Sequence, residues 1–182
     1  MKMRPWMTVG LFGLCGCSGT LTYIEIDFRD AVTVEGGGLL SELVGALGFD
    51  GFTSMDLTDA QELQNQGVEP GDIQDVQLVT FQLTATSPSG ADLSFINTMD
   101  VFASAPDLNE VQVASQDTFP AGQAQVDFTI SALDLTEYVV SESMTLSTDV
   151  NGNQPVDDTE IEAYVVLDVG VTLQGALNQA RN

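Results

Sequence analysis

Hydrophobic and polar residues alternate along most of this chain with a period of two, which is typical of β-strands that have one buried face. The alternation is most regular near the C-terminus, where Val165, Leu167 and Val169 alternate with Val166 and Asp168. It occurs in seven stretches: 21–28, 75–86, 93–104, 110–115, 124–130, 143–149 and 160–173. Turn residues separate these stretches, so we predict seven or so short strands.

The connections between the stretches indicate the fold class. Apart from one insert and a helical turn at 134–139, no helical pattern lies between them, and the β–α–β alternation of a parallel sheet is missing. We therefore predict a mostly β domain, an antiparallel β-sandwich of about seven strands, with a β-barrel as the alternative. The alternation changes phase at Leu78-Val79, which indicates either a bulge or a strand buried on both faces.

The insert comprises residues 39–67, where the hydrophobic period changes. Leu39, Leu43 and Leu47 recur every four residues, as on the apolar face of a helix. A second short helix is predicted over residues 56–64, because acidic and Thr residues stand at its start. We expect a short helical insert in an otherwise β-rich chain.

The N-terminus has a different composition from the rest. Lys2 and Arg4 precede a short apolar run, which ends in Leu14-Cys15-Gly16-Cys17. This layout is typical of a secretory signal peptide, and the run is too short for a transmembrane helix of roughly 20 residues. The final quartet resembles the lipobox of bacterial lipoproteins. An ordinary signal peptide with a soluble product is the alternative.

The resemblance implies how the chain is divided and where it is located. Residues 1–16 would be a removed signal peptide, and Cys17 would carry the lipid that attaches the chain to a membrane. Residues 17–20 would form a tether, 21–175 a single domain, and 176–182 a polar tail. Ser18 follows the lipidated cysteine, where an Asp would retain enteric lipoproteins in the inner membrane. The resemblance thus implies export and an outer-membrane location.

The chain is strongly acidic, with 27 Asp and Glu residues against four Lys and Arg. All 27 acids but only two basic residues, Arg29 and Arg181, follow Cys17, so the processed chain has a formal charge of −25. Such a surface repels nucleic acid and anionic lipid headgroups. We expect no nucleic-acid partner and a preference for cationic partners or divalent metal. A protein or glycan partner cannot be named from the sequence.

The residue types that are missing exclude much enzyme chemistry. The chain contains no His, no Lys after Lys2, and no Cys after Cys17. Ser–His–Asp and Cys–His triads, His-ligated zinc and Schiff-base lysines are therefore excluded. Only carboxylate chemistry remains. We expect a protein that is not an enzyme and that requires no cofactor.

One stretch, residues 149–160, has the residue types of a metal site. Its candidate calcium ligands have the spacing of a twelve-residue calcium loop: Asp149, Asn151, Asn153, Asp157 and Glu160. The stretch is similar to the calcium loops of EF-hands and dockerins. It departs from them at Gln154, where that loop has Gly, and in its flanks, which predict strands rather than helices. An acidic hairpin loop is the alternative.

These observations leave three functional hypotheses. The first is a non-enzymatic, membrane-anchored envelope lipoprotein with a structural or interaction-mediating role. The second is a ligand-binding module for carbohydrate or peptide, assisted by calcium at 149–160. The third is a hydrolase that uses only carboxylates, which requires one acid with a raised pKa.

Overall fold

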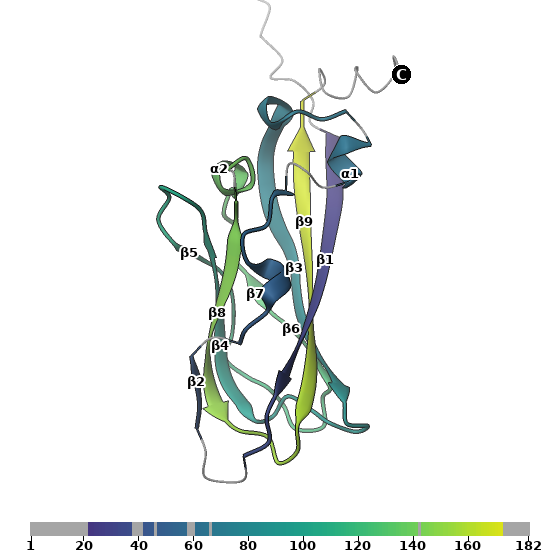
Figure 1. Cartoon of the computed structure of the whole chain (residues 1–182), viewed down its shortest axis with the longest axis vertical. Coiled ribbons are helices and arrows are strands. Elements are labelled where there is room, and N and C mark those ends of the chain that lie inside the picture. Colours follow the sequence, from purple (N-terminus) through teal and green to yellow (C-terminus); the bar gives the residue numbers. More distant parts are fainter. Residues whose placement is uncertain are drawn as a thin grey trace, which may run out of the picture.

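The computed structural model describes residues 22–37, 42–45, 47–57, 61–65, 67–141 and 143–172. Within these ranges the strands form two antiparallel sheets that face each other across a hydrophobic core (Figure 1). The predicted β-sandwich is confirmed, and the strands do not close into the alternative barrel. The predicted signal peptide, Cys17, the tether and the tail lie outside the described residues.

The first sheet, sheet A, has four strands in the order β1-β9-β3-β6. Their bounds are β1, Thr22–Val34; β9, Thr159–Val171; β3, Ile73–Ser87; and β6, Gln125–Asp127. The pairing of β1 with β9 extends over the whole length of both strands. The register of β3 against β9 shifts between Leu78 and Thr80, so the phase change in the sequence is a bulge.

The second sheet, sheet B, has five strands in the order β2-β8-β4-β5-β7. Their bounds are β2, Glu42–Gly45; β8, Thr145–Asn153; β4, Ile96–Ser104; β5, Val111–Gln116; and β7, Thr129–Ile130. The described residues thus contain nine strands, two more than the alternation predicts.

One additional strand arises because the predicted strand at 124–130 is divided between the sheets. β6 pairs with β3 in sheet A, whereas β7 pairs with β5 in sheet B. The chain crosses from one sheet to the other at Phe128, which is buried and whose N–H donates to the Phe81 carbonyl at 3.0 Å. The Phe128 ring also packs against the Phe81 and Phe119 rings, with centroids 4.8 and 6.0 Å away. Packing of these rings holds the two sheets together at this crossing.

The helical insert is only partly confirmed. The expected helix around Leu43 and Leu47 is wrong, because residues 42–45 are β2 and pair with β8. Gly45 has φ +108°, a value outside the helical region. Leu47 is instead fixed to Thr148, whose buried hydroxyl accepts from the Leu47 N–H and donates to the Leu47 carbonyl.

The remaining helices of the described ranges are short. They are η1, Asp50–Phe52; α1, Gln61–Gln64; η3, Pro70–Asp72; and α2, Thr136–Val139. The predicted short helix at 56–64 and the turn at 134–139 therefore correspond to α1 and α2. Within the described residues, no helix has the length and hydrophobicity needed to cross a membrane.

Candidate functional site

A cavity among the described residues lies at one end of the sandwich. It has a volume of about 520 Å³, is open to solvent, and is lined by residues of 88–95, which follow β3, and of 153–159, which connect β8 to β9. Val34, at the end of β1, pairs with Thr159 beside this cavity, whereas Thr22 pairs with Val171 at the opposite end. The cavity and the start of the domain are therefore at opposite ends of the molecule (Figure 1).

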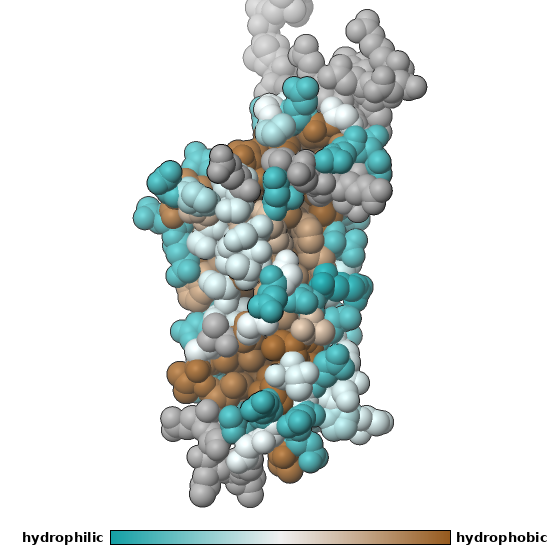
Figure 2. Space-filling model, in the orientation of Figure 1, coloured by the Kyte–Doolittle hydropathy of each residue, from teal (hydrophilic) through white to brown (hydrophobic). Residues whose placement is uncertain are grey.

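The cavity wall combines apolar and polar side chains. Phe95 is half-buried against the core, Pro155 is buried, and Val156 is 74% exposed at the turn. Figure 2 shows hydrophobic surface at this end of the molecule, over β2 and at the turn between β8 and β9. Asp92 and Asp157 are the carboxylates of the wall. A site of this volume, with polar residues beside an apolar part of the wall, suits a small ligand or one side chain.

The Asp92 carboxylate is held in place by hydrogen bonds. Its Oδ1 accepts from the Ser94 hydroxyl at 2.6 Å and from the Ser94 N–H at 3.0 Å, and its Oδ2 accepts from the Gly122 N–H at 2.6 Å. These bonds, the Ser94 hydroxyl first, lower the pKa of Asp92 below its ordinary value. The wall therefore contains a charged carboxylate in a fixed orientation at neutral pH.

Two close backbone contacts keep the cavity segments together. The Asn153 N–H donates to the Phe95 carbonyl at 2.7 Å, and a Cβ on Gly152 would lie 2.4 Å from that oxygen. On the other side, the Gly36 N–H donates to Asp158 Oδ1 at 2.8 Å. A Cβ on Gly36 would lie 2.8 Å from the Asp157 carbonyl carbon. Only glycine, which has no Cβ, allows the backbone segments to come this close at residues 36 and 152. Gly36 and Gly152 therefore determine how the segments of the cavity wall are placed.

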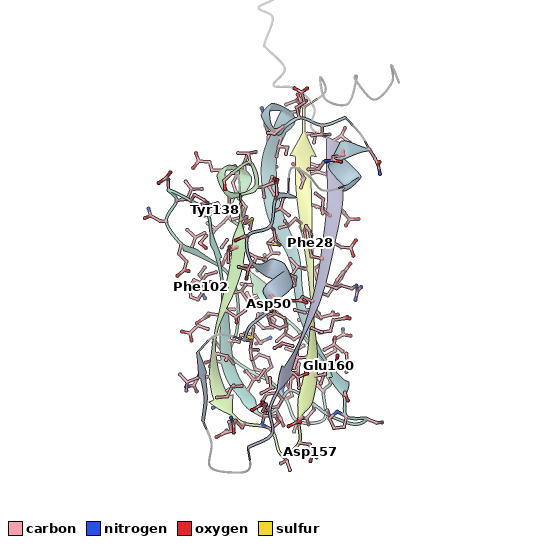
Figure 3. The ribbon with its side chains drawn as sticks, in the orientation of Figure 1. Phe28, Asp50, Phe102, Tyr138, Asp157 and Glu160 are labelled. Atoms are coloured by element: carbon pink, nitrogen blue, oxygen red, sulfur yellow. The ribbon has the colours of Figure 1, made fainter. Side chains whose placement is uncertain are left out.

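The five predicted calcium ligands do not lie together in one loop. Asp149, Asn151 and Asn153 are in β8, exposed on the outer face of sheet B, where they alternate with inward-facing residues. Glu160 is exposed on the outer face of sheet A, in β9. Figure 3 shows Asp157 at the tip of the turn and Glu160 further along β9. Since the two faces are separated by the core, the predicted twelve-residue loop is wrong: its first ligands cannot meet the last around one ion.

A smaller group of these residues does lie together. Asn153 and Asp157 both line the cavity. Within the described ranges, no three or more acidic or cysteine side chains are placed so that they could hold a metal ion. Calcium binding stays a prediction, with only two of its five expected ligands at the cavity.

Carboxylates also cover the outer face of sheet A. Arg29 is the only Lys or Arg in the part of the chain that the structure describes. Its Nη1 lies 2.9 Å from Glu162 Oε1, and its guanidinium lies 4.0 Å from the centre of the Tyr164 ring. Glu25 and Asp168 stand directly opposite each other on β1 and β9, a like-charge pair. This face is therefore strongly negative, and its one cation is already paired.

At the far end of sheet A, the Tyr23 hydroxyl donates to Asp75. This hydrogen bond raises the pKa of Tyr23 and lowers the pKa of Asp75. The pKa of Asp92 is also lowered. A general acid in a hydrolase needs a raised pKa, so neither Asp75 nor Asp92 fits that role.

Sequence analysis alone did not identify Asp92 or Phe95 as site residues. Asp92 and Ser94 form an Asx turn, whose Asp-x-Ser pattern is a local signal that could have been noticed. Phe95 has no such signal, because its role depends on the distant Gly152.

No protein-family model matches the chain, and no curated protein matches it significantly. Among solved structures, the chain is similar to the decameric BFDV capsid protein, with 8% sequence identity and a TM-score of 0.43. That match covers 84% of this chain and 99% of the capsid chain. At this identity and TM-score, the similarity identifies neither a family nor a function.

Proposed function

We propose that this chain is a non-enzymatic lipoprotein of the bacterial envelope, anchored by a lipid on Cys17. Its β-sandwich mediates an interaction at the end that lies away from the membrane. The proposal combines the lipobox-like quartet at residues 14–17 with the arrangement of the sandwich.

The arrangement of β1 carries the proposal. Thr22 follows Cys17 by only five residues and pairs with Val171, at the end opposite the cavity. β1 has 13 residues, which at about 3.3 Å per residue is a length of roughly 40 Å. A lipid on Cys17 would hold the Thr22 end near the bilayer. The cavity would then face away from it, roughly 40 Å further out.

The charge of the chain supports the same orientation. A formal charge of −25 after processing is repelled by anionic headgroups. The negative outer face of sheet A is therefore unsuited to lying on the bilayer. A short tether, together with repulsion between the acidic domain and anionic headgroups, favours a domain that extends away from the membrane surface.

The experiment is metabolic labelling of the full chain with an alkyne-bearing fatty acid, followed by intact mass spectrometry. We expect a lipid-labelled product that begins at Cys17. Cys17→Ser should lose the label, whereas Cys15→Ser, the matched control two residues away, should keep it. Labelling that survives in Cys17→Ser, or no labelling of the unsubstituted chain, would contradict the proposal. Separation of the two membranes then tests location, and Ser18→Asp should increase the inner-membrane fraction.

A second candidate is favoured by the cavity. A ligand-binding module needs a concave site with a few fixed polar groups, and the cavity has both. Carbohydrate or peptide ligands, with or without calcium, belong to this candidate. It is compatible with lipid anchoring, since the two involve opposite ends of the domain.

A further inference from the structure

The cavity at the membrane-distal end is lined by two carboxylates, Asp92 and Asp157. No Lys or Arg is among its lining residues in the part of the chain that the structure describes. Arg29, the one basic residue in the described ranges, is paired with Glu162 on sheet A. A cation that enters the cavity therefore meets two carboxylates and no competing charge.

We propose that the cavity binds a basic side chain, lysine or arginine, presented by a partner protein. The inference deepens the proposed function and rests on it for the orientation of the cavity away from the membrane. Binding itself does not require the anchor.

The apolar wall distinguishes a basic side chain from a bare metal ion. Lysine and arginine have an aliphatic stem that packs on apolar surface while the charged group reaches polar atoms. Phe95, Pro155 and Val156 provide that surface. Calcium instead takes six to eight oxygen ligands, usually with several carboxylates, whereas this wall has only two carboxylates and no group of three acidic side chains placed to hold a metal among the described residues.

The polar groups of the wall can receive the charged end. Each Asp92 oxygen has two lone-pair positions, and Oδ2 accepts one hydrogen bond within the chain, from Gly122. Among the described residues, one acceptor position on Oδ2 therefore remains for an N–H donor. The Asp157 side chain is exposed at the turn, and Asn153 is a further polar residue that lines the cavity. Since Asp92 is already fixed by the loops, it loses little freedom when a donor binds.

The wider surface favours a basic partner as well. The negative outer face of sheet A and the net charge steer cationic molecules toward the domain. Steering by the whole charge is not specific, however. The test must therefore separate binding in the cavity from general attraction.

The experiment is an NMR titration of the full chain, purified in detergent, with acetyl-Ala-Lys-Ala-amide at about 0.15 M salt. We expect saturable shifts in residues 88–95 and 153–159, and none with the norleucine peptide that lacks the ammonium group. Asp157→Asn should weaken binding about tenfold, a typical loss for a charged hydrogen bond. Val156→Ser should weaken it by a smaller factor. Both side chains are exposed, so both variants should fold.

Asp27→Asn is the matched control, because it removes the same charge from the exposed outer face of sheet A. It should change the affinity less than twofold. Equal losses in Asp27→Asn and Asp157→Asn, equal binding of the norleucine peptide, or no saturable shift up to about 10 mM would each overturn the cavity proposal. Fatty-acid labelling of the same preparation tests the anchor separately: labelled protein without binding refutes only the cavity, and binding by unlabelled protein refutes only the anchor.

Discussion

Substitution of Gly152 by Ala tests how the two cavity segments are held together. The added Cβ would stand 2.4 Å from the Phe95 carbonyl oxygen and 2.9 Å from the Ile96 Cα. Heavy atoms in contact normally lie about 3.5 Å or more apart, so the backbone at Phe95 must move by roughly 1 Å. Because Asn153 donates to that same carbonyl at 2.7 Å, the movement also breaks this hydrogen bond.

The expected cost follows from these two effects. Overpacking of a well-packed site costs about 1–3 kcal/mol, and loss of one hydrogen bond costs about 0.5–1.5 kcal/mol. The smaller backbone entropy of Ala in the unfolded chain offsets about 0.4–1 kcal/mol. We expect Gly152→Ala to lower the free energy of unfolding by about 2–3 kcal/mol. For a chain of this size, that is a decrease in Tm of about 4–12 °C.

The assay is urea and thermal unfolding of the full chain, followed by circular dichroism. Gly48→Ala is the control, because a Cβ there has nothing within 4 Å and its φ is not positive. The control should leave the free energy of unfolding unchanged or raise it slightly. If Gly152→Ala and Gly48→Ala unfold at the same urea concentration, the close approach of Phe95 to β8 does not hold the cavity wall.

Three further predictions concern hydrogen bonds and charge. The pKa of Tyr23 should lie above its ordinary value of 10.0, because the Tyr23 hydroxyl donates a hydrogen bond to Asp75. The stability that this hydrogen bond contributes is complete below pH 10 and is lost as pH rises through the raised pKa, and Asp75→Asn should return the absorbance titration at 295 nm toward 10. Thr148→Val leaves the buried Leu47 N–H without its partner, while the Leu47 carbonyl still accepts from the Phe49 N–H, so the free energy of unfolding should fall by about 1–3 kcal/mol in urea denaturation, and Thr148→Ser should retain most of it. The expected calcium ligands are split between two faces, so calcium and magnesium at equal concentration should raise Tm equally, by charge screening. A calcium-selective rise that Asp157→Asn removes would instead show that the ligands at the cavity bind calcium.

Strands of this fold could be predicted where they have one buried face. β1, β4 from Met99 on and β9 up to Val165 follow the alternation, and the phase change at Leu78-Val79, which indicated either a bulge or a strand buried on both faces, is a bulge. The pattern could not show that the stretch around Phe128 changes sheets, because alternation records burial and not the pairing partner. It also predicted a helix where β2 pairs with β8, since four residues are too few to establish a period.

The candidate site could not be predicted from local pattern. Oxygen-bearing residues at positions 1, 3 and 5 of a calcium loop have the same spacing as the solvent face of a strand, and Asp149, Asn151 and Asn153 occupy such a face. The cavity itself is made by two segments about 60 residues apart in the sequence. Their contact depends on Gly152 and Phe95, and no spacing rule connects these two residues.

The full-length pairing of β1 with β9 determines how the domain bears mechanical load. A partner that pulls at the cavity end, against an anchor before Thr22, stretches β1 along its own axis. Inter-strand hydrogen bonds are perpendicular to the strands, so such a pull shears the bonds along all 13 residues of β1 together. A pull across the sheet would instead open them one pair at a time. The domain is therefore strongest in the direction that joins its two ends.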